Sequence, residues 1–304
     1  MSTLAIHSLD RADIETAIRD RILAARDDVA GIVLFGSFAR NEEWQDVDVL
    51  VVLHTPFEPG LEWRARVREL RNAVSMPRAE IIVTDTTGLQ RGLANHDFLL
   101  MDIAYDAIVL HGEAVRDTLA SAREEIEASG IRRLPTGWHF PVEYRRSTPL
   151  SPTPNDVRAE RWLADADDDL RAAASLLGAG IYSRSVFFSQ LATEKAVKAV
   201  LLCFGRFDRT HYVSGTLREV IEREAVGTWA DQLARLADHA EALEDHITRS
   251  RYVMEDAEGE EPWVPVEHYD QEAATEARER ARGSLAIARD FTAWWFAPDA
   301  AGES

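Results

Sequence analysis

The sequence has little cysteine, little lysine and no long apolar run. Its one cysteine, Cys203, excludes a disulfide framework within the chain and any metal site built from several cysteines. No apolar run approaches the ~18 residues that a membrane-spanning helix needs. The first residues lack both a basic start and a long apolar stretch, so they do not indicate a secretory signal. The expected location is therefore the cytoplasm, with no membrane partner.

Lysine is almost absent, although the chain is highly charged. Lys195 and Lys198 are the only lysines among 34 basic residues, and 53 acidic residues bring the net charge to −19. A chain this acidic is repelled by bulk nucleic acid unless positive charge is concentrated locally. The composition suits either a high-salt cytoplasm or a GC-rich coding sequence. In either case the two lysines are candidates for a specific role.

The first part of the chain alternates between predicted helices and strands. At ~150 residues per domain, the length of 304 residues predicts about two domains. Apolar periodicity and short apolar runs predict an α/β (α+β) first domain, residues 1–128, around a small mixed sheet. Helices are expected over 10–29, 61–74, 87–95 and 113–128, and strands over 30–37, 47–54, 79–85 and 102–110.

The pattern changes after residue 128. Residues 129–154 contain five of the eleven prolines and show no periodicity, which predicts a proline-rich linker. From 155 to 297 the apolar residues keep a helical period and the loops are short, which predicts an all-α bundle. Residues 298–304 are expected to form a flexible tail.

The strongest signal for chemistry lies where the first predicted strand ends. Gly36 and Ser37 follow that strand, and Asp46 and Asp48 open the next one. Alternation along a strand places the two aspartates on one face, with Val47 on the other. Paired carboxylates suit divalent cations such as Mg²⁺, and a Gly-Ser turn offers backbone N–H groups and a hydroxyl to phosphate. The arrangement is typical of metal-assisted phosphoryl or nucleotidyl transfer.

A two-metal site of this kind also needs a third carboxylate from a neighbouring strand. Glu80 begins the third predicted strand and is level with the aspartate pair if the strands align at their starts. Asp85, at the far end of the same strand, is the alternative. We predict that Glu80 is the third metal ligand.

Residues 30–110 resemble a minimal nucleotidyltransferase domain of the polymerase-β superfamily, whose motif is Gly-Ser, a spacer, Asp-x-Asp and a later acid. The spacer is shorter here than in the family pattern. Asn41 stands where the family has glycine, and asparagine tolerates the left-handed backbone. The resemblance implies catalysis and binding of two Mg²⁺ ions by Asp46, Asp48 and Glu80, and nucleotide binding by Gly36, Ser37 and Arg40.

The implied activity is the transfer of a nucleoside monophosphate from an NTP, such as ATP, to a hydroxyl group. The acceptor hydroxyl could belong to a protein tyrosine, an RNA 3′ end or a small molecule. An aminoglycoside-type antibiotic nucleotidyltransferase is one alternative, in which the helical half recognises the acceptor. A nucleotide sensor that binds NTP without turnover is another.

Residues 155–297 resemble a HEPN domain, a helical bundle often encoded with or fused to such nucleotidyltransferases. The resemblance includes a Glu-Lys-x-x-Lys pattern in which Lys195 and Lys198 share one helical face. Because arginine is used everywhere else, the pair indicates a site that prefers a compact ammonium group, and an ion pair within the bundle is the alternative. The segments that carry the resemblance are 189–205, 210–221 and 249–253.

Arg206 and His211 match, by spacing, the Arg-x4-His pattern of HEPN ribonucleases, where Arg stabilises phosphate and His is a general acid or base. A ribonuclease regulated by the attached domain is therefore an alternative function, and it needs both side chains together in a groove. In paired toxin–antitoxin systems of these families, AMP is added to a tyrosine two positions after the His. Here Tyr212 follows directly, so that motif does not support self-modification. The resemblance also implies a homo-oligomer, such as a dimer, formed through the helical half, and a role in toxin–antitoxin control or defence.

Overall fold

The computed structural model describes residues 10–58, 60–74, 79–150, 152–255 and 262–297. By its internal contacts the chain divides into two compact units, Met1–Gly130 and Ile131–Ser304. Each unit has its own sheet and its own hydrophobic core. Of the helices in the described part of the chain, none combines the length and apolar character that crossing a bilayer requires.

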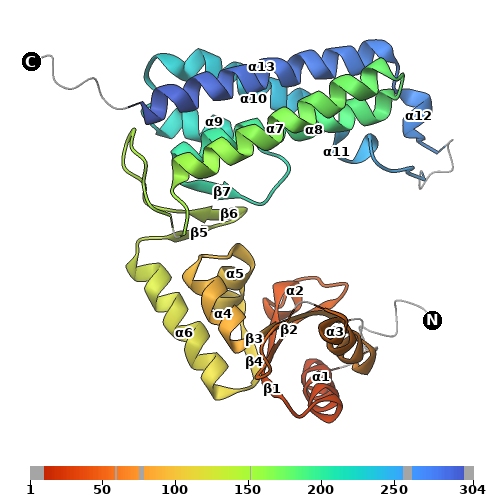
Figure 1. Ribbon diagram of the computed structural model, residues 1–304, viewed down its shortest axis with the longest axis vertical. Helices are drawn as coiled ribbons and strands as arrows, with labels where there is room; N and C mark the ends of the chain where they lie inside the picture. The colour runs from red at the N-terminus through yellow and green to blue at the C-terminus, as the bar shows by residue number, and fades with distance from the viewer. Residues whose placement is uncertain (1–9, 59, 75–78, 151, 256–261, 298–304) are drawn as a thin grey trace, which may run out of the picture. The chain divides into compact units, whose positions relative to one another are not determined.

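The first unit is built around a four-stranded mixed sheet (Figure 1). Its strands are β1 (Val29–Phe35), β2 (Val47–Leu53), β3 (Ala79–Asp85) and β4 (Ile108–His111). Their order is β3-β2-β1-β4, in which β1 pairs antiparallel with β2 and β4, and β2 pairs parallel with β3. Its helices are α1 (Arg11–Ala25), α2 (Gly36–Ala39), α3 (Leu61–Ala73), α4 (Thr86–Ala94), α5 (Phe98–Asp106) and α6 (Glu113–Ala128).

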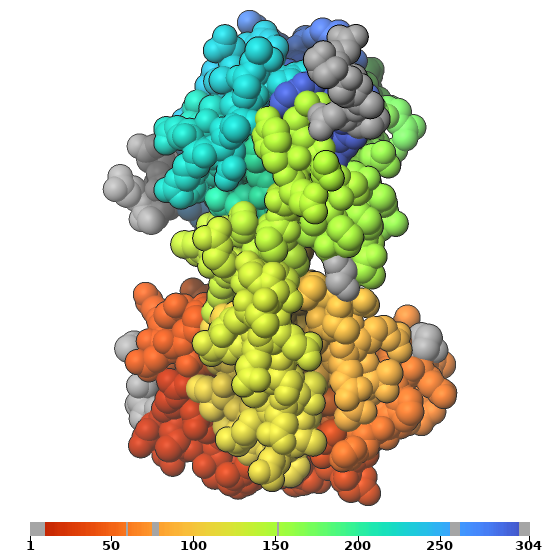
Figure 2. Space-filling view, turned by 90° about the vertical axis from the view of Figure 1, so that its left-hand side faces the viewer, coloured from red at the N-terminus to blue at the C-terminus, as the bar shows by residue number. Residues whose placement is uncertain are grey.

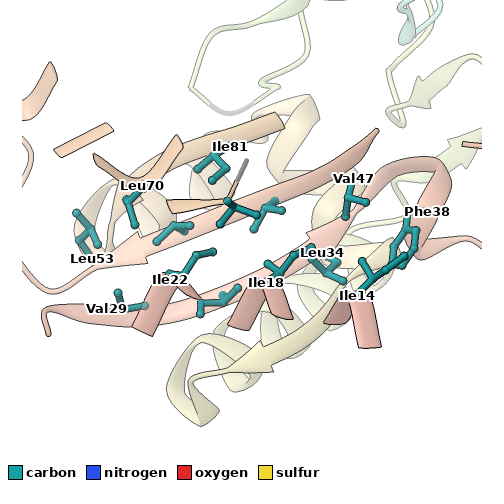
Figure 3. Packing of buried hydrophobic residues seen from close by; sticks show 14 residues of the cluster. Ile14, Ile18, Ile22, Val29, Leu34, Phe38, Val47, Leu53, Leu70 and Ile81 are labelled. Atoms are coloured by element: carbon teal, nitrogen blue, oxygen red, sulfur yellow. The ribbon is translucent and has the colours of Figure 1, made fainter. Parts of the chain in front are cut away.

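Helices cover both faces of this sheet, because β1 and β2 are apolar on both sides. On one face the stripe Ile14, Ile18 and Ile22 of α1 packs against Val47 and its alternate neighbours in β2, together with α3 (Figure 3). On the other face Leu50 and Val52 of β2 pack with α4, α5 and α6. The outer side of α6 forms the yellow surface of this unit in Figure 2. The period-two alternation predicted for β2 is therefore confirmed.

The strand predicted over 102–110 is helical in its first half. Helix α5 extends to Asp106, and β4 begins only at Ile108. The helix begins after Asp97, whose side chain accepts a hydrogen bond from the N–H of Leu100 at 3.1 Å. Such an N-cap satisfies a donor that the first turn leaves unpaired, and it favours helix over strand for an apolar run that fits both.

The second unit is mainly helical, as the sequence predicts. Helix α8 is its most buried element and packs against α7 and α13. Phe204, just after α8, packs against Phe291 and Trp295 of α13, with ring centroids 5.9 and 4.5 Å apart. The helices are α7 (Asn155–Gly178), α8 (Tyr182–Cys203), α9 (Ser214–Arg223), α10 (Ala230–Glu244), α11 (His246–Arg249), α12 (Pro265–His268) and α13 (Gln271–Phe296), with a 3-10 turn, η2 (Gly227–Trp229).

The segment expected to link the two domains is built into the second unit instead. Strands β5 (Arg132–Leu134) and β6 (Gly137–His139) form an antiparallel sheet with β7 (Arg206–Asp208), which follows α8. Trp138 is fully buried and Phe140 nearly so. The correction has a physical reason: each strand is three residues long, too short to show a period, and β7, which pairs with β6, lies about 70 residues further along the chain.

Candidate active site

The structure brings the three predicted acids to one end of the first sheet. Asp48 is the second residue of β2, and Asp46 lies just before that strand. In the parallel pairing of β2 with β3, Asp48 is directly opposite Glu80, whereas Asp85 pairs with Leu53 at the other end. Paired residues of neighbouring strands point to the same face, and so do residues two apart along one strand. The strand register therefore places Glu80, and not Asp85, beside Asp48, and Asp46 lies two residues before Asp48 in the chain.

The electrostatics of Asp48 reflect this crowding of carboxylates. Partial burial raises the pKa of Asp48 above its ordinary value, and the charges of Asp46 and Glu80 raise it further. The charge of Arg40 opposes them by stabilising the ionised form. Two neighbouring acids destabilise the ionised form of this carboxylate, and a cation that joins the group would stabilise it.

Gly36 allows the loop after β1 to approach Asp48. Its φ is +74°, a left-handed conformation that favours glycine. A Cβ atom at this position would lie 3.0 Å from Cγ of Asp48 and closer still to its Oδ2 atom. Ser37 follows in the short helix α2, half-buried. The Gly-Ser turn and the Asp48 carboxylate are thus in immediate proximity.

Arg40 ends α2 and is held by two acids. Its guanidinium pairs with Glu42 through Nη2 and with Asp106 of α5 through Nη1, each at 2.8 Å. These hydrogen bonds raise the pKa of Arg40 further above its already high value, so it stays charged. The next residue, Asn41, has φ of 60°, which confirms that asparagine takes the left-handed position predicted for it.

Asp85 has a structural role in the fold. Its side chain caps α4 by accepting from the N–H of Gly88, and it also accepts from the N–H of Phe57. The residue is only 5% exposed. A carboxylate that satisfies two backbone donors is occupied, so the alternative third acid is ruled out as a ligand of this site in the observed geometry.

The donor set suits a hard cation, although the side chains do not form a closed cage. Among the described residues, no three His, Cys, Asp or Glu side chains converge closely enough to hold a metal ion as they stand. Yet Asp46, Asp48 and Glu80 supply only carboxylate oxygens, which are ligands that Mg²⁺ prefers. In proteins Mg²⁺ often completes its coordination shell with waters and phosphate oxygens rather than with further side chains. The residues therefore fit Mg²⁺ by chemistry and by register.

Sequence reasoning missed three residues around the Gly-Ser turn. Arg11 of α1 donates to the Ala39 carbonyl and to the Asn41 side chain, both at 3.3 Å. Asp106 and Glu42 hold Arg40 as described above. Arg11 also pairs with a glutamate four residues on, so in the sequence it is indistinguishable from an ordinary exposed helical ion pair.

The two lysines of the helical unit are engaged in ion pairs. Lys195 contacts Asp169 of α7 at 2.6 Å and also pairs with Asp165. Lys198 contacts Glu194 at 2.8 Å. The structure thus favours the alternative of ion pairs within the bundle.

Glu194 is the centre of a buried polar cluster. Burial raises its pKa, but the charge of Lys198 and hydrogen bonds from Lys198, Gln190 and His211 outweigh burial and lower it. His211 lies 3.0 Å from both Glu194 oxygens through Nδ1, and its side chain is half-exposed. Tyr212, next to it, is 60% exposed.

Arg206 is paired with different acids from His211. It lies on β7, is largely buried, and contacts Asp208 and Glu219 at 3.3 Å. Both acids would have to give way before this guanidinium could hold a phosphate. The geometry therefore does not support the ribonuclease hypothesis, which needs Arg206 and His211 available together.

Comparisons with known proteins match both halves. A HEPN domain model matches residues 159–291, and a nucleotidyltransferase domain model matches residues 17–85. The Methanocaldococcus jannaschii protein named "Putative toxin MJ1304" is 40% identical over 134 residues, which are 44% of this chain and 87% of that protein.

Two solved structures show similarity to part of the chain. TT1696 from Thermus thermophilus is 28% identical, with a TM-score of 0.37, over 44% of this chain and 98% of its own. A tri-AMPylated Shewanella oneidensis HEPN toxin in complex with an MNT antitoxin is 15% identical, with a TM-score of 0.27, over 39% of this chain and 88% of its own. The chain belongs to the HEPN family through its helical unit, to which a polymerase-β-like nucleotidyltransferase domain is fused.

Proposed function

We propose that the protein is a Mg²⁺-dependent nucleotidyltransferase that moves a nucleoside monophosphate from an NTP to a hydroxyl group. The observation that carries the proposal is the parallel register of Asp48 with Glu80, beside Asp46 and against the Gly-Ser turn. This combination supplies oxygen ligands for cations and donors for phosphate at the same end of one sheet.

Each residue has a chemical role in this proposal. Asp46, Asp48 and Glu80 would hold Mg²⁺, which when bound neutralises phosphate charge and lowers the barrier to attack at phosphorus. Ser37 and the adjacent backbone orient the triphosphate. One carboxylate takes the proton of the acceptor hydroxyl, its oxygen forms a bond to the α-phosphorus, and the bond to the departing pyrophosphate breaks.

The acceptor is proposed to be a protein hydroxyl, with the helical unit as the first candidate. The similarity of that unit to a protein named as a toxin favours a regulated protein target. Tyr212 is exposed and directly follows His211 of the polar cluster in the chain. An RNA 3′ end and a small molecule, including an antibiotic, remain the other acceptor classes that the test must separate.

The deciding experiment is intact mass spectrometry of the full chain after incubation with each NTP and Mg²⁺. A gain of one nucleotide in the wild type, lost in the Asp46→Asn/Asp48→Asn double variant, supports transfer to the protein itself. Tyr212→Phe is the matched acceptor variant, since it removes only the hydroxyl. Loss of the mass gain in that variant assigns the acceptor.

Pyrophosphate release is a further readout by which the proposal can be refuted. If no mass is gained, pyrophosphate release is measured with total RNA or a cell extract added as a source of acceptors. Release in the wild type alone supports transfer to an external acceptor. No release with any NTP or acceptor source, from a protein that remains folded, overturns the proposal.

A further inference from the structure

The guanidinium group of Arg40 forms hydrogen bonds with two carboxylates at once. Its Nε and Nη2 atoms donate to the two oxygens of Glu42 at 3.0 and 2.8 Å. Glu42 therefore occupies one edge of the planar guanidinium group. Its Nη1 atom donates to Oδ2 of Asp106 at 2.8 Å. A side-by-side pair of donors is the geometry with which arginine binds carboxylates and phosphates.

The two carboxylates differ in how firmly they are fixed. The side chain of Glu42 is 55% exposed and lies two residues after Arg40 in the turn that follows α2. The side chain of Asp106 is 7% exposed, and the residue ends α5, 66 positions away in the sequence. An exposed ion pair is weak and readily exchanges with water, whereas a buried acid keeps its place. One partner is therefore exchangeable and the other is fixed.

Arg40 also belongs to the candidate active site. Its backbone N–H donates to the Gly36 carbonyl at 3.1 Å, so α2 links it rigidly to the Gly-Ser turn. A triphosphate bound at this turn would therefore lie one helical turn from Arg40, whose guanidinium Glu42 contacts.

We propose that Glu42 occupies the place of a triphosphate oxygen pair on Arg40, and that Asp106 anchors the guanidinium while the two exchange. Glu42 is thus an autoinhibitory contact, and Asp106 is a positioning residue for nucleotide binding. This inference rests on the proposed nucleotidyltransferase function and adds to it how the nucleotide gains access. A triphosphate displaces Glu42 because it brings more negative charge to the same donors.

The proposal predicts opposite effects for two acids that contact the same arginine. Glu42→Gln should tighten triphosphate binding by about two- to fivefold, the factor expected when a weak exposed competitor is removed. Asp106→Asn should weaken binding by about tenfold, because the guanidinium loses its charged anchor. Asp106→Glu, which keeps the charge, should recover part of the affinity.

The experiment is equilibrium dialysis of the full chain against a non-hydrolysable ATP analogue with Mg²⁺. Glu43→Gln is the matched control, because Glu43 is the exposed neighbour of Glu42 and its loss changes the net charge equally. It should leave affinity within about 1.5-fold of the wild type, as expected for an exposed charge outside the contact. In an Arg40→Gln background, Glu42→Gln should no longer tighten binding.

Each outcome decides between the alternatives. Tightening by Glu42→Gln that depends on Arg40 supports the inference, even if Asp106→Asn fails to fold. The inference is overturned if Glu42→Gln behaves like Glu43→Gln or weakens binding while the wild type binds the analogue. A wild type that binds no triphosphate overturns the proposed function as well, so the two failures are distinguishable.

Discussion

Gly36→Ala is the substitution that most directly tests the candidate site. Gly36 has a positive φ, and an added Cβ would lie 3.0 Å from Cγ of Asp48 and closer still to its Oδ2 atom. Ordinary van der Waals contact begins near 3.4 Å. The Asp48 carboxylate must therefore withdraw by more than an ångström, or the loop must move away from it.

The expected losses follow from these two effects. The left-handed conformation costs alanine about 1 kcal/mol of folding free energy relative to glycine. Displacement of a catalytic group by about 1 Å costs roughly 100-fold in rate, which corresponds to about 2.7 kcal/mol in the activation free energy. We therefore expect a protein that folds normally but transfers nucleotide about 100-fold more slowly.

Gly227→Ala is the matched control for the backbone cost. Gly227 also has a positive φ, of 58°, but a Cβ there would meet nothing within 4 Å. Urea denaturation should show a similar loss of about 1 kcal/mol for both variants. Only Gly36→Ala should lose transfer activity, measured as pyrophosphate release with Mg²⁺ and NTP. Activity of Gly36→Ala within threefold of the wild type would refute the assignment of Asp48 to the catalytic group.

The remaining predictions concern stability and use urea denaturation. Asp48→Asn should raise the free energy of unfolding at neutral pH, because the raised pKa of Asp48 means that its charge destabilises the folded state. The free energies of unfolding of wild type and variant should converge below about pH 4, where Asp48 is protonated in the folded and in the unfolded state. Glu194→Ala should cost about 3–5 kcal/mol, because it leaves Lys198 without its buried partner. Since the pKa of Glu194 is lowered, its stabilisation in the wild type should be lost as pH falls through that pKa. Gly137→Ala should cost about 3 kcal/mol, since its Cβ would lie 2.8 Å from the Phe207 carbonyl carbon; an equal cost for Gly178→Ala, which meets nothing within 4 Å, would contradict this reasoning.

The acids of the candidate site could be predicted because their placement follows from local rules. Alignment of the strand starts predicted that Glu80, rather than Asp85, lies level with Asp48, and the register of β2 with β3 confirms this pairing. Strand alternation predicts that Asp46 and Asp48 share one face. Both rules depend only on strand periodicity and on a parallel pair. The left-handed backbone of Asn41 also follows from a local rule, because asparagine tolerates this conformation.

What the sequence could not predict depends on pairing across long stretches of chain. Asp106 lies in a short helix 66 residues from Arg40, and no local pattern marks it as a partner. The acids that pair with Lys195 could not be identified, because the chain offers 53 acidic residues. Strand β6 pairs with the distant β7 and carries the buried ring of Trp138, and β5 pairs in turn with β6, so the sequence around these two short strands has no signal of its own.

The small sheet of the second unit changes the length of the connection between the two halves. Because β5 to β7 pair within the helical unit, only three residues separate the end of α6 from the start of β5. A flexible linker over 129–154 would extend to roughly 90 Å, whereas three residues extend to roughly 10 Å. Two units joined by so few residues sample fewer relative orientations than two units on a long flexible tether. Under the proposed function, modification of a hydroxyl within one chain would be limited to those orientations. An acceptor on a second molecule has no such restriction, and its modification would be recognised by a rate that rises with protein concentration.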